Sequence, residues 1–401
     1  MHPDAKTLWR GPRWTLALLL AGLSSLGPFA IDTYLPAFDG MTASLPATPV
    51  QMQQTLSVYL LAFAAMNLFH GALADSFGRR QVMLWGIGVF TLASVGCALA
   101  PDIATLLVFR ALQGLSCGAG MVVARTVVRD LYGPVDAQRV LSQVTIYFAV
   151  APAVAPMIGG VLFVHLGWPS IFWFLAAIGL LLWGAAWRKL PETLHPSQRQ
   201  SFSAGHLLRG YRQMMASGTF MALVLASSVP FNAMFLFVLA SPAFLGELLG
   251  LAPTQYFWFF CVSVAGVMGG AAVSGRLAGR VTPQRQIGLG FAVMGVAAVW
   301  GIAMAALLPP HPLYNIPPTA LVSFGWSLLA PAVTLLVLDR VPERRGMASS
   351  VQSSVGSTAN ALVAGVLAPL VMHSMLGLAL TSAALMAVGW LSWIWVRRRL
   401  D

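Results

Sequence analysis

The sequence is poor in charged residues. Only 9% of its 401 residues are charged, whereas a typical soluble domain contains about 25%. This shortage excludes an ordinary soluble protein. The 23 lysines and arginines outnumber the 12 acidic residues, but no basic cluster accompanies a soluble domain that would favour nucleic acid as a partner. The excess of positive charge is instead typical of cytoplasmic loops that face anionic lipid.

Cysteine and lysine are also scarce. The three cysteines, Cys97, Cys117 and Cys261, lie in apolar segments at spacings that match neither a disulfide framework nor a metal site. The two lysines, Lys6 and Lys189, do not follow glycines, so the sequence contains no P-loop for a nucleotide. Paired carboxylates and nucleophile–base motifs are missing as well. We therefore predict no enzyme, no catalytic residue, no metal and no cofactor, and a driving force from an ion gradient or a partner.

Hydrophobic residues make up 58% of the sequence. They gather in twelve stretches, each near the roughly 20 residues that a helix needs to cross a bilayer. We therefore predict an all-α membrane protein with twelve transmembrane helices. The predicted spans are 14–36, 55–74, 82–100, 103–125, 139–164, 168–189, 219–245, 254–275, 287–309, 314–338, 347–372 and 375–396.

Lysine and arginine follow a strict pattern between these spans. Of the 23, 22 lie in or at the edges of every second gap, and the intervening gaps contain none. Short cytoplasmic loops retain basic residues, whereas translocated loops are depleted of them. The pattern predicts that both termini lie in the cytoplasm. Arg110 is the only basic residue inside an apolar stretch.

The longest cytoplasmic gap divides the chain into two six-helix bundles. The predicted divisions are 1–189 and 219–401, joined by a linker at 190–218 that either contains an amphipathic helix on the inner membrane face or is plainly solvated. The segment Gly71–Arg80, after span two, has an echo in Gly275–Arg285, after span eight, at an offset of 204 residues. Such a repeat predicts two similar bundles around a central cavity, with the substrate near the midplane.

The first of these segments, Gly71-Ala-Leu-Ala-Asp75-Ser-Phe-Gly78-Arg79-Arg80, resembles the signature G-x-L-a-D-r-x-G-r-k/r of the major facilitator superfamily. The resemblance implies a gating charge relay in which Asp75 pairs with arginines across the bundle. Gly71 would permit tight helix packing, and Gly78 a sharp turn. A simple helix stop followed by arginines that set the topology is the alternative.

Two further segments resemble signatures of the same superfamily. Residues Leu107–Gly114, in span four, resemble the motif l-x-x-x-R-x-x-q-G and include Arg110. Residues Ala151–Gly160, in span five, resemble the antiporter signature g-x-x-x-G-P-x-x-G-G, with alanine at 151 and 155 where glycine is usual. Ordinary packing of a kinked helix explains the same pattern. The helix-kink residues are Pro152, Pro156, Gly159 and Gly160.

Four short segments narrow the resemblance. These segments are Asp32–Pro36, Gln54–Ser57, Trp168–Trp173 and Pro191–Leu194. They look like segments of the Bcr/CflA drug-resistance family, whose members are twelve-span drug:proton antiporters that export bicyclomycin and chloramphenicol. The firm motifs lie mainly in the first half of the chain. The resemblance implies the major facilitator fold, a small-molecule substrate, a monomer and the bacterial inner membrane.

The coupling ion requires a titratable group inside the membrane. Of the 12 acidic residues, only Asp32 lies within a span and away from the cytoplasmic loops. At about 1.5 Å per residue, its depth differs from that of Arg110 by about 5 Å. Burial and a neighbouring cation act in opposite directions on the proton affinity of a carboxyl group. We predict that Asp32 carries the coupling proton and Arg110 tunes it; a static ion pair, or an Asp32 that caps a helix end, is the alternative.

The family resemblance places the substrate cavity between spans one, four, seven and ten. Polar and aromatic side chains there are suited to amphipathic cargo, although each aromatic residue also fits core packing or contact with lipid. The resulting function is proton-coupled efflux of amphipathic small molecules by alternating access; the alternative is export of a metabolite such as a nucleoside, sugar or amino-acid derivative. The predicted cavity residues are Tyr59, Phe63, Asn67, Gln113, Tyr147, Phe231, Asn232, Met234, Phe235 and Trp326.

Overall fold

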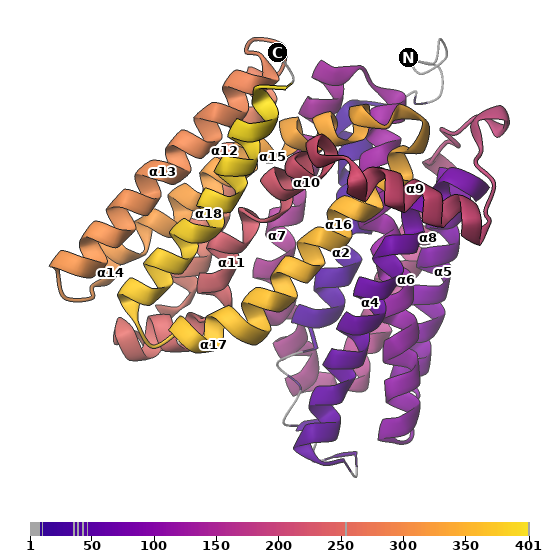
Figure 1. The fold of residues 1–401 in the computed structure, drawn as a ribbon. Coiled ribbons are helices and arrows are strands. Elements are labelled where there is room, and N and C mark those ends of the chain that lie inside the picture. The colour runs from indigo at the N-terminus through magenta and orange to yellow at the C-terminus, as the bar shows by residue number, and fades with distance from the viewer. Residues whose placement is uncertain are drawn as a thin grey trace. The chain divides into compact units, whose positions relative to one another are not determined.

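The chain folds almost entirely into helices (Figure 1). The structure is a computed structural model that describes residues 9, 11–34, 37, 40–41, 44–45, 47–252 and 255–399. Within these residues, twelve helical segments are long and apolar enough to cross a membrane, which confirms the predicted number. Residues 35, 36 and 254 of the predicted spans lie outside the described residues.

The first six spans are single helices, whereas several later ones are interrupted. The spans of the first half are α2 (Arg13–Asp32), α4 (Pro49–Phe77), α5 (Arg79–Ala98), α6 (Ile103–Leu131), α7 (Pro134–Leu166) and α8 (Pro169–Lys189). Those of the second half are α10 (Gly218–Ser228) with α11 (Phe231–Leu239), α12 (Phe257–Leu277), α13 (Pro283–Leu307), α14 (Pro312–Asn315) with α15 (Pro317–Arg340), α16 (Arg345–Leu362) with α17 (Ala368–Val371), and α18 (Met375–Arg397).

Local sequence determines where these helices begin and break. Thr48 forms a capping box with Gln51 ahead of α4, which therefore starts earlier than the predicted residue 55. The predicted seventh span, 219–245, is broken after Ser228 because Pro230, at the start of α11, has no backbone N–H to donate. It then continues into the π-helical segment η3 (Pro242–Leu248). A second π-helical segment, η6 (Val363–Leu367), interrupts the eleventh span.

The chain forms two compact units that do not follow the sequence in a simple way. Unit 1 consists of residues 1–133, 147–210 and 341–350, and unit 2 of residues 134–146, 211–340 and 351–401. The start of α7 therefore belongs to unit 2, and the start of α16 to unit 1. The division of the chain into 1–189 and 219–401 stays a prediction, and the units differ from it chiefly in these two exchanged segments.

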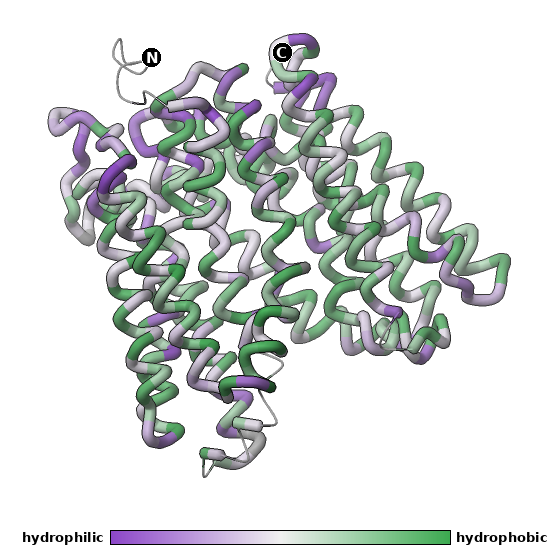
Figure 2. Tube along the Cα trace, turned by 180° about the vertical axis from the view of Figure 1, so that it is seen from behind, coloured by the Kyte–Doolittle hydropathy of each residue, from purple (hydrophilic) through white to green (hydrophobic). Residues whose placement is uncertain are grey.

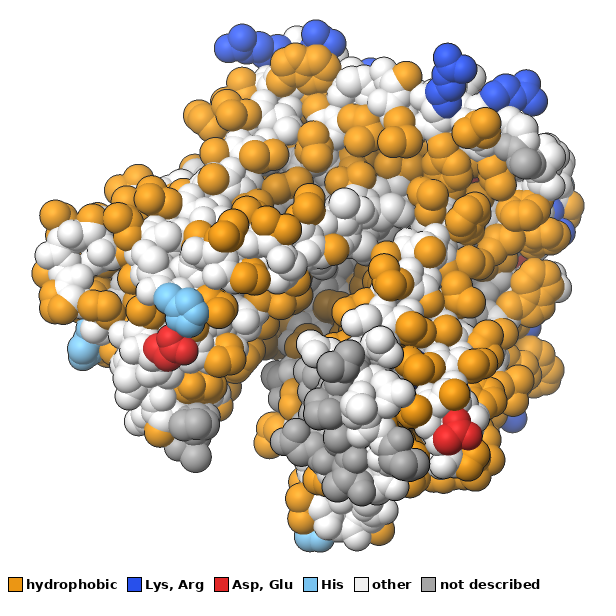
Figure 3. Space-filling model, turned by 60° about the horizontal axis from the view of Figure 1, so that its bottom comes forward, with side chains coloured by type: hydrophobic (Ala, Val, Ile, Leu, Met, Phe, Trp, Pro, Cys, Tyr) orange, Lys and Arg blue, Asp and Glu red, His pale blue; other side chains and the backbone are white. Residues whose placement is uncertain are grey.

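Polar and apolar residues are separated along the helices of each unit. Figure 2 shows hydrophobic residues over the length of the helices and hydrophilic residues gathered toward their ends. In Figure 3, the face that comes forward carries acidic and histidine side chains, whereas lysine and arginine lie only toward its edges. This separation of basic side chains follows the alternation seen in the sequence.

The linker contains one helix, α9 (Ala204–Ala216). Met214 on this helix is buried, whereas Leu208 and Met215 are exposed. The part of the linker at 204–216 is therefore ordered as a helix. Its placement on the membrane surface stays a prediction.

Glycines on α6 allow the close packing that builds the core of unit 1. A Cβ atom on Gly114 would lie 2.2 Å from the backbone oxygen of Tyr59 on α4. A Cβ atom on Gly118 would lie 2.1 Å from the side-chain oxygen of Asn67. Small residues at these positions let the two helices approach closely, as in other membrane helix pairs. This packing fixes the position of α6, on which Arg110 lies.

Candidate functional site

A buried carboxylate holds the start of α16 in unit 1. The Asp75 side chain, at the end of α4, is only 2% exposed. It accepts hydrogen bonds from the backbone N–H groups of Gly346, at 3.1 Å, and Met347, at 2.9 Å. These groups belong to the first turn of α16, where a negative charge stabilises the helix. Asp75 therefore acts as a charged cap supplied by another helix.

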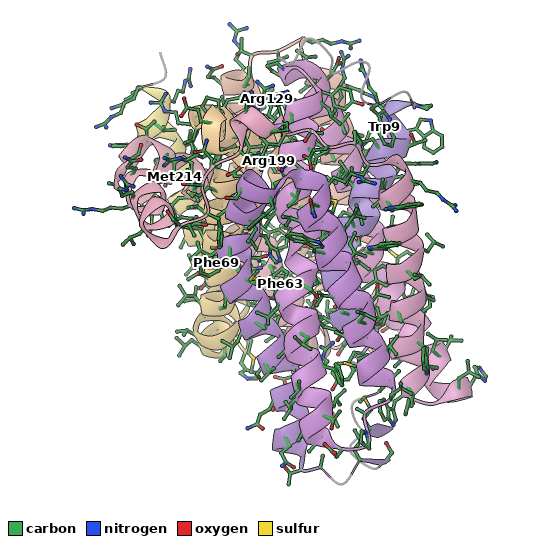
Figure 4. All side chains as sticks on the ribbon, turned by 90° about the vertical axis from the view of Figure 1, so that its right-hand side faces the viewer. Trp9, Phe63, Phe69, Arg129, Arg199 and Met214 are labelled. Atoms are coloured by element: carbon green, nitrogen blue, oxygen red, sulfur yellow. The ribbon has the colours of Figure 1, made fainter. Side chains whose placement is uncertain are left out.

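Asp75 is part of a cluster of four charged residues. Arg79 donates to Asp75 and, from Nε at 3.2 Å, to Asp130 at the end of α6. Arg345 donates to the other oxygen of Asp130 at 3.0 Å. We call these four residues, with the backbone of Gly346 and Met347, the charged junction. Figure 4 labels Arg129, which precedes Asp130, at this end of unit 1.

Two glycines make the close approach at this junction possible. A Cβ atom on Gly71 would lie 1.7 Å from the backbone oxygen of Gly346, so no larger residue fits without moving α16. The N–H group of Gly71 also donates to Ser350 Oγ at 2.9 Å. Gly78 has a φ of 104°, a conformation that glycine adopts most readily, and it separates α4 from α5.

The predicted gating residues do not all lie at the charged junction. Gly71, Asp75, Gly78 and Arg79 lie at or beside the junction, whereas the Arg80 side chain donates to the backbone oxygen of Trp187 at 2.6 Å. Arg80 therefore anchors the end of α8 and does not join the charged cluster.

Three residues beside the predicted gating residues were not among the predicted site residues. Asp130 and Arg345 complete the cluster, and the carboxylate of Glu192 accepts hydrogen bonds from the N–H groups of Arg79, at 2.9 Å, and Arg80, at 3.2 Å. Glu192 thus caps α5 from the linker side. It lies in the Pro191–Leu194 segment that carried the family resemblance, which was the only signal for it in the sequence.

Arg110 lies in the interior of unit 1 and is fully buried. Its Nη1 group donates to the backbone oxygen of Ala30, at 3.1 Å, and to the side-chain oxygen of Gln113, at 2.9 Å. The guanidinium group lies between two aromatic rings, 4.6 Å from the centre of Tyr34 and 4.4 Å from that of Tyr59. Such cation–π contacts are strongest when water is excluded.

The static ion pair between Asp32 and Arg110, which was the alternative to a proton-carrying Asp32, is not formed in this structure. Asp32 is the last residue of α2 and is partly buried, and among the described residues no ion pair joins it to Arg110. The two tyrosine rings lie where a counter-ion was predicted. Arg110 Nε and Nη2 are buried and have no hydrogen-bond partner in the described part of the chain. Arg110 thus keeps donors available for a carboxylate.

The alternative role of Asp32 as a helix cap is also not observed. The backbone N–H groups of Thr33 and Tyr34, which it would cap, donate to the carbonyl oxygens of Phe29 and Ile31. The end of α2 is therefore closed by its own backbone. The described residues therefore show neither an ion pair with Arg110 nor a helix-cap hydrogen bond for the Asp32 carboxyl group.

The predicted cavity residues fall into two groups. In unit 1, Tyr59, Asn67 and Gln113 are fully buried inside the bundle, where they pack and position neighbouring helices. Their role as cavity lining stays a prediction. Phe63, labelled in Figure 4, stacks on Tyr59 with ring centres 6.5 Å apart, and Tyr147 is partly exposed.

In unit 2, the aromatic members of the predicted cavity form one cluster. The Phe231 ring lies 5.5 Å from that of Phe235 and 4.9 Å from that of Trp326. Met234 is partly exposed beside them on α11, whereas Asn232 on the same helix is fully buried. The cluster therefore joins α11 to α15 within unit 2.

The helix-kink residues lie on α7, which continues through both Pro152 and Pro156. Gly159 has a clear packing role, since a Cβ atom there would lie 2.0 Å from the backbone oxygen of Thr33, which directly follows α2. A Cβ atom on Gly160 would meet no atom of the described residues within 4 Å. Packing thus explains Gly159, and the structure gives no packing reason for Gly160.

Comparison with known proteins adds independent evidence. Residues 17–364 match the Major Facilitator Superfamily. The chain is 26% identical over 396 residues to a bicyclomycin resistance protein homolog of Haemophilus influenzae, covering 95% of this chain and 96% of that protein. It is 27% identical over 398 residues to multidrug resistance protein D of Escherichia coli, covering 96% of each chain. Multidrug resistance protein MdtL of Escherichia fergusonii is 30% identical over 327 residues, or 81% of each chain.

Solved structures share the fold at lower identity. The fucose:proton symporter of Escherichia coli matches with a TM-score of 0.74 and 14% identity, over 94% of this chain and 98% of that one. The human organic anion transporter MFSD10 matches with a TM-score of 0.70 and 18% identity, over 98% of this chain and all 100% of that one. Both are transporters, so the fold and the sequence comparisons agree.

Proposed function

Because the chain belongs to the major facilitator superfamily, as the match over residues 17–364 establishes, we propose that it exports amphipathic small molecules in exchange for protons by alternating access. It is a multi-pass membrane transporter and not an enzyme. The resistance proteins among its relatives support drug-like cargo. The proton serves as the coupling ion, without a cofactor, and the transporter is a monomer with both termini in the cytoplasm of a bacterial cell.

The buried Arg110 is the observation that carries the proton-coupling part of this proposal. Nη1 of Arg110 is held by the backbone oxygen of Ala30, two residues before Asp32, while Nε and Nη2 bond to none of the described residues. A deprotonated Asp32 is attracted to these donors, whereas a protonated Asp32 is not. Proton binding and release therefore change the attraction between the end of α2 and the middle of α6.

The charged junction supplies the element that moves. Alternating access requires a helix that can adopt two positions, and the first turn of α16 is held in one of them by Asp75. Release of Gly346 and Met347 from this carboxylate would let α16 leave the end of α4. Coupling then consists of a proton-dependent step at Asp32 and a mechanical step at Asp75.

The charges inside the membrane favour neutral cargo. Asp32 and Arg110 together carry no net charge when Asp32 is ionised and one positive charge when it is protonated, so neither state attracts a dication. The aromatic cluster of Phe231, Phe235 and Trp326 offers ring faces to an amphipathic molecule. Neutral antibiotics such as chloramphenicol fit this description better than polycations do.

The test is transport by purified protein in proteoliposomes with an imposed pH gradient. We expect the wild type to move chloramphenicol against its gradient and Asp32→Asn to lose this active transport while retaining equilibrium binding. Unimpaired active transport by Asp32→Asn would contradict the proposal. A panel of nucleosides, sugars and amino-acid derivatives tested in parallel decides between drug efflux and export of a metabolite.

A further inference from the structure

Unit 2 contains a second buried junction that the charged residues do not explain. It joins the first turns of α7, which belong to this unit, to α12, α13 and α15. The Gln138 side chain on α7 is 5% exposed, and Gln286 on α13 and Ser274 on α12 are fully buried. Two carboxamides so deep in a helical bundle require complete hydrogen bonding, because an unsatisfied polar group is costly there.

The hydrogen bonds form a continuous network. Gln138 Nε2 donates to the side-chain oxygen of Gln286, at 2.7 Å, and to the backbone oxygen of Ser274, at 3.0 Å. Gln286 Nε2 donates to Ser274 Oγ and to the backbone oxygen of Leu328 on α15, both at 2.8 Å. We call these four residues the amide junction. It links four helices and contains no charge.

The sequence repeat explains why this junction is uncharged. At the offset of 204 residues, Asp75 corresponds to Gly279 and Arg79 to Pro283. The two charges that hold the start of α16 are therefore absent at the matching positions in unit 2. Gly279 adopts a φ of 78° and packs against Val135, in the first turn of α7, where a Cβ atom would lie 2.8 Å from its side chain. In unit 2, the close contact between Gly279 and Val135 and the hydrogen bonds of Gln138 and Gln286 take the place of the Asp75 carboxylate.

We infer that Gln138 and Gln286 are positioning residues that hold the start of α7 on unit 2, and that this junction must open when the start of α7 separates from unit 2 during transport. The inference rests on the proposed function, since alternating access is what requires that separation. Because the amide pair does not titrate, its strength is independent of pH. Proton binding at Asp32 then does not act on the amide pair, which opens as a mechanical consequence of the proton-dependent step. The same helix start also makes one charged contact, because Arg139, which pairs with Asp136, donates from Nη2 to the Ala278 backbone oxygen at 3.3 Å.

A buried thiol can report the opening of this junction. Ser142 on α7 is 1% exposed and lies next to Gly275 on α12, so Ser142→Cys places a thiol in the interface with little change in volume. Cys261, the exposed native cysteine, is replaced by serine in this background. The rate of labelling by a membrane-permeant maleimide, normalised to unfolded protein at each pH, then measures how often α7 separates from α12.

Two single variants and the corresponding double variant test the Gln138–Gln286 pair. Gln138→Leu leaves the buried Gln286 carboxamide short of a donor, and Gln286→Leu leaves Gln138 short of an acceptor, so we expect each to raise the labelling rate about tenfold. The double variant removes both partners of the Gln138–Gln286 bond, so we expect it to label no faster than Gln286→Leu, which already deprives Ser274 Oγ and the Leu328 backbone oxygen of their donor. Gln143→Leu is the matched control, because the Gln143 side-chain oxygen on the same helix has no partner among the described residues.

A charged variant provides a measurement that distinguishes the proposed role from a purely structural one. Gln138→Glu places a carboxylate against the side-chain oxygen of Gln286, so labelling should rise with pH as the new group ionises, whereas the parent stays flat. Single variants that label like the parent, or a double variant that labels faster than either single one, would overturn the inference. These measurements need neither substrate nor a gradient, so failure of proton coupling in the Asp32→Asn test leaves their outcome unaffected.

Discussion

Each unit holds the start of a helix whose remainder belongs to the other unit, and the two units do so by different means. In unit 1, a carboxylate caps the first turn of α16, and two arginines and a second carboxylate surround it. In unit 2, two carboxamides hold the first turns of α7 through neutral hydrogen bonds, and Arg139 adds a bond to the backbone oxygen of Ala278. A charged contact depends on protonation and on its surroundings, whereas an amide contact depends on geometry. The comparison indicates that both units have a junction at the start of a helix. Charged side chains hold it in unit 1, and carboxamides hold it in unit 2.

The largest expected difference between the junctions lies in their first glycines. Gly71→Ala forces a Cβ to 1.7 Å from the backbone oxygen of Gly346, whereas Gly275→Ala makes only an ordinary contact with Ser142, at 3.4 Å. We expect Gly71→Ala to weaken docking of α16 by about 3 kcal/mol, or about a hundredfold in transport rate. Transport in proteoliposomes checks this, with Gly275→Ala as the matched control. Equal losses in both variants would remove the distinction.

The next effect concerns the charge itself. Asp75→Asn keeps the shape and one acceptor oxygen but removes the negative charge beside the α16 helix start. We expect a loss of about 2 kcal/mol, or about thirtyfold in transport rate, with near-normal substrate binding. Measuring kcat and KM separately checks this, because a junction residue should change mainly kcat. A rise in KM alone would assign Asp75 to substrate binding.

A smaller effect separates two buried arginines. Arg79 is paired with carboxylates, whereas Arg110 is held largely by tyrosine rings. Tyr59→Leu removes one ring face and should lower active efflux about tenfold, while Tyr59→Phe keeps the face and most of the activity. Both variants lose the hydroxyl that bonds the Gly27 backbone oxygen at 3.0 Å, so they differ only in the ring. Similar losses in both would assign the role to the hydroxyl.

The smallest effect is expected from the linker. Glu192→Gln keeps an acceptor for the backbone N–H groups of α5 but removes the charge near Arg79 and Arg80. We expect about a threefold decrease in transport rate, since a neutral oxygen still caps the helix. Thermal unfolding in detergent provides the second measurement, with a shift of only a few degrees. A loss as large as that of Asp75→Asn would place Glu192 within the charged junction itself.

The sequence predicts local features better than long-range partners. The segment Gly71–Arg80 identified the charged end of α4, because its residues are contiguous. The pairing of Gln138 with Gln286 joins residues 148 positions apart and leaves no local signature. Asp130 and Glu192, two acids near gaps that the sequence predicts to be cytoplasmic, could not be told apart from other loop acids without the fold.

Arg110 illustrates a different limit of sequence reasoning. Its span and burial were predictable, because a lone charge in an apolar stretch must face the protein interior. Its neighbours were not, since electrostatics alone favoured the carboxylate of Asp32 over the rings of Tyr34 and Tyr59. Aromatic residues are common in membrane helices, so their role as partners of a cation emerges only from the packing of α2, α4 and α6.

Proton release on substrate binding tests the central claim most directly. Chloramphenicol is added to the purified transporter in weakly buffered detergent solution, and the protons released are counted with a pH indicator. Wild-type protein should release about one proton for each molecule bound, whereas Asp32→Asn should bind chloramphenicol and release none. Release of the same number of protons by both proteins would show that Asp32 is not the proton carrier.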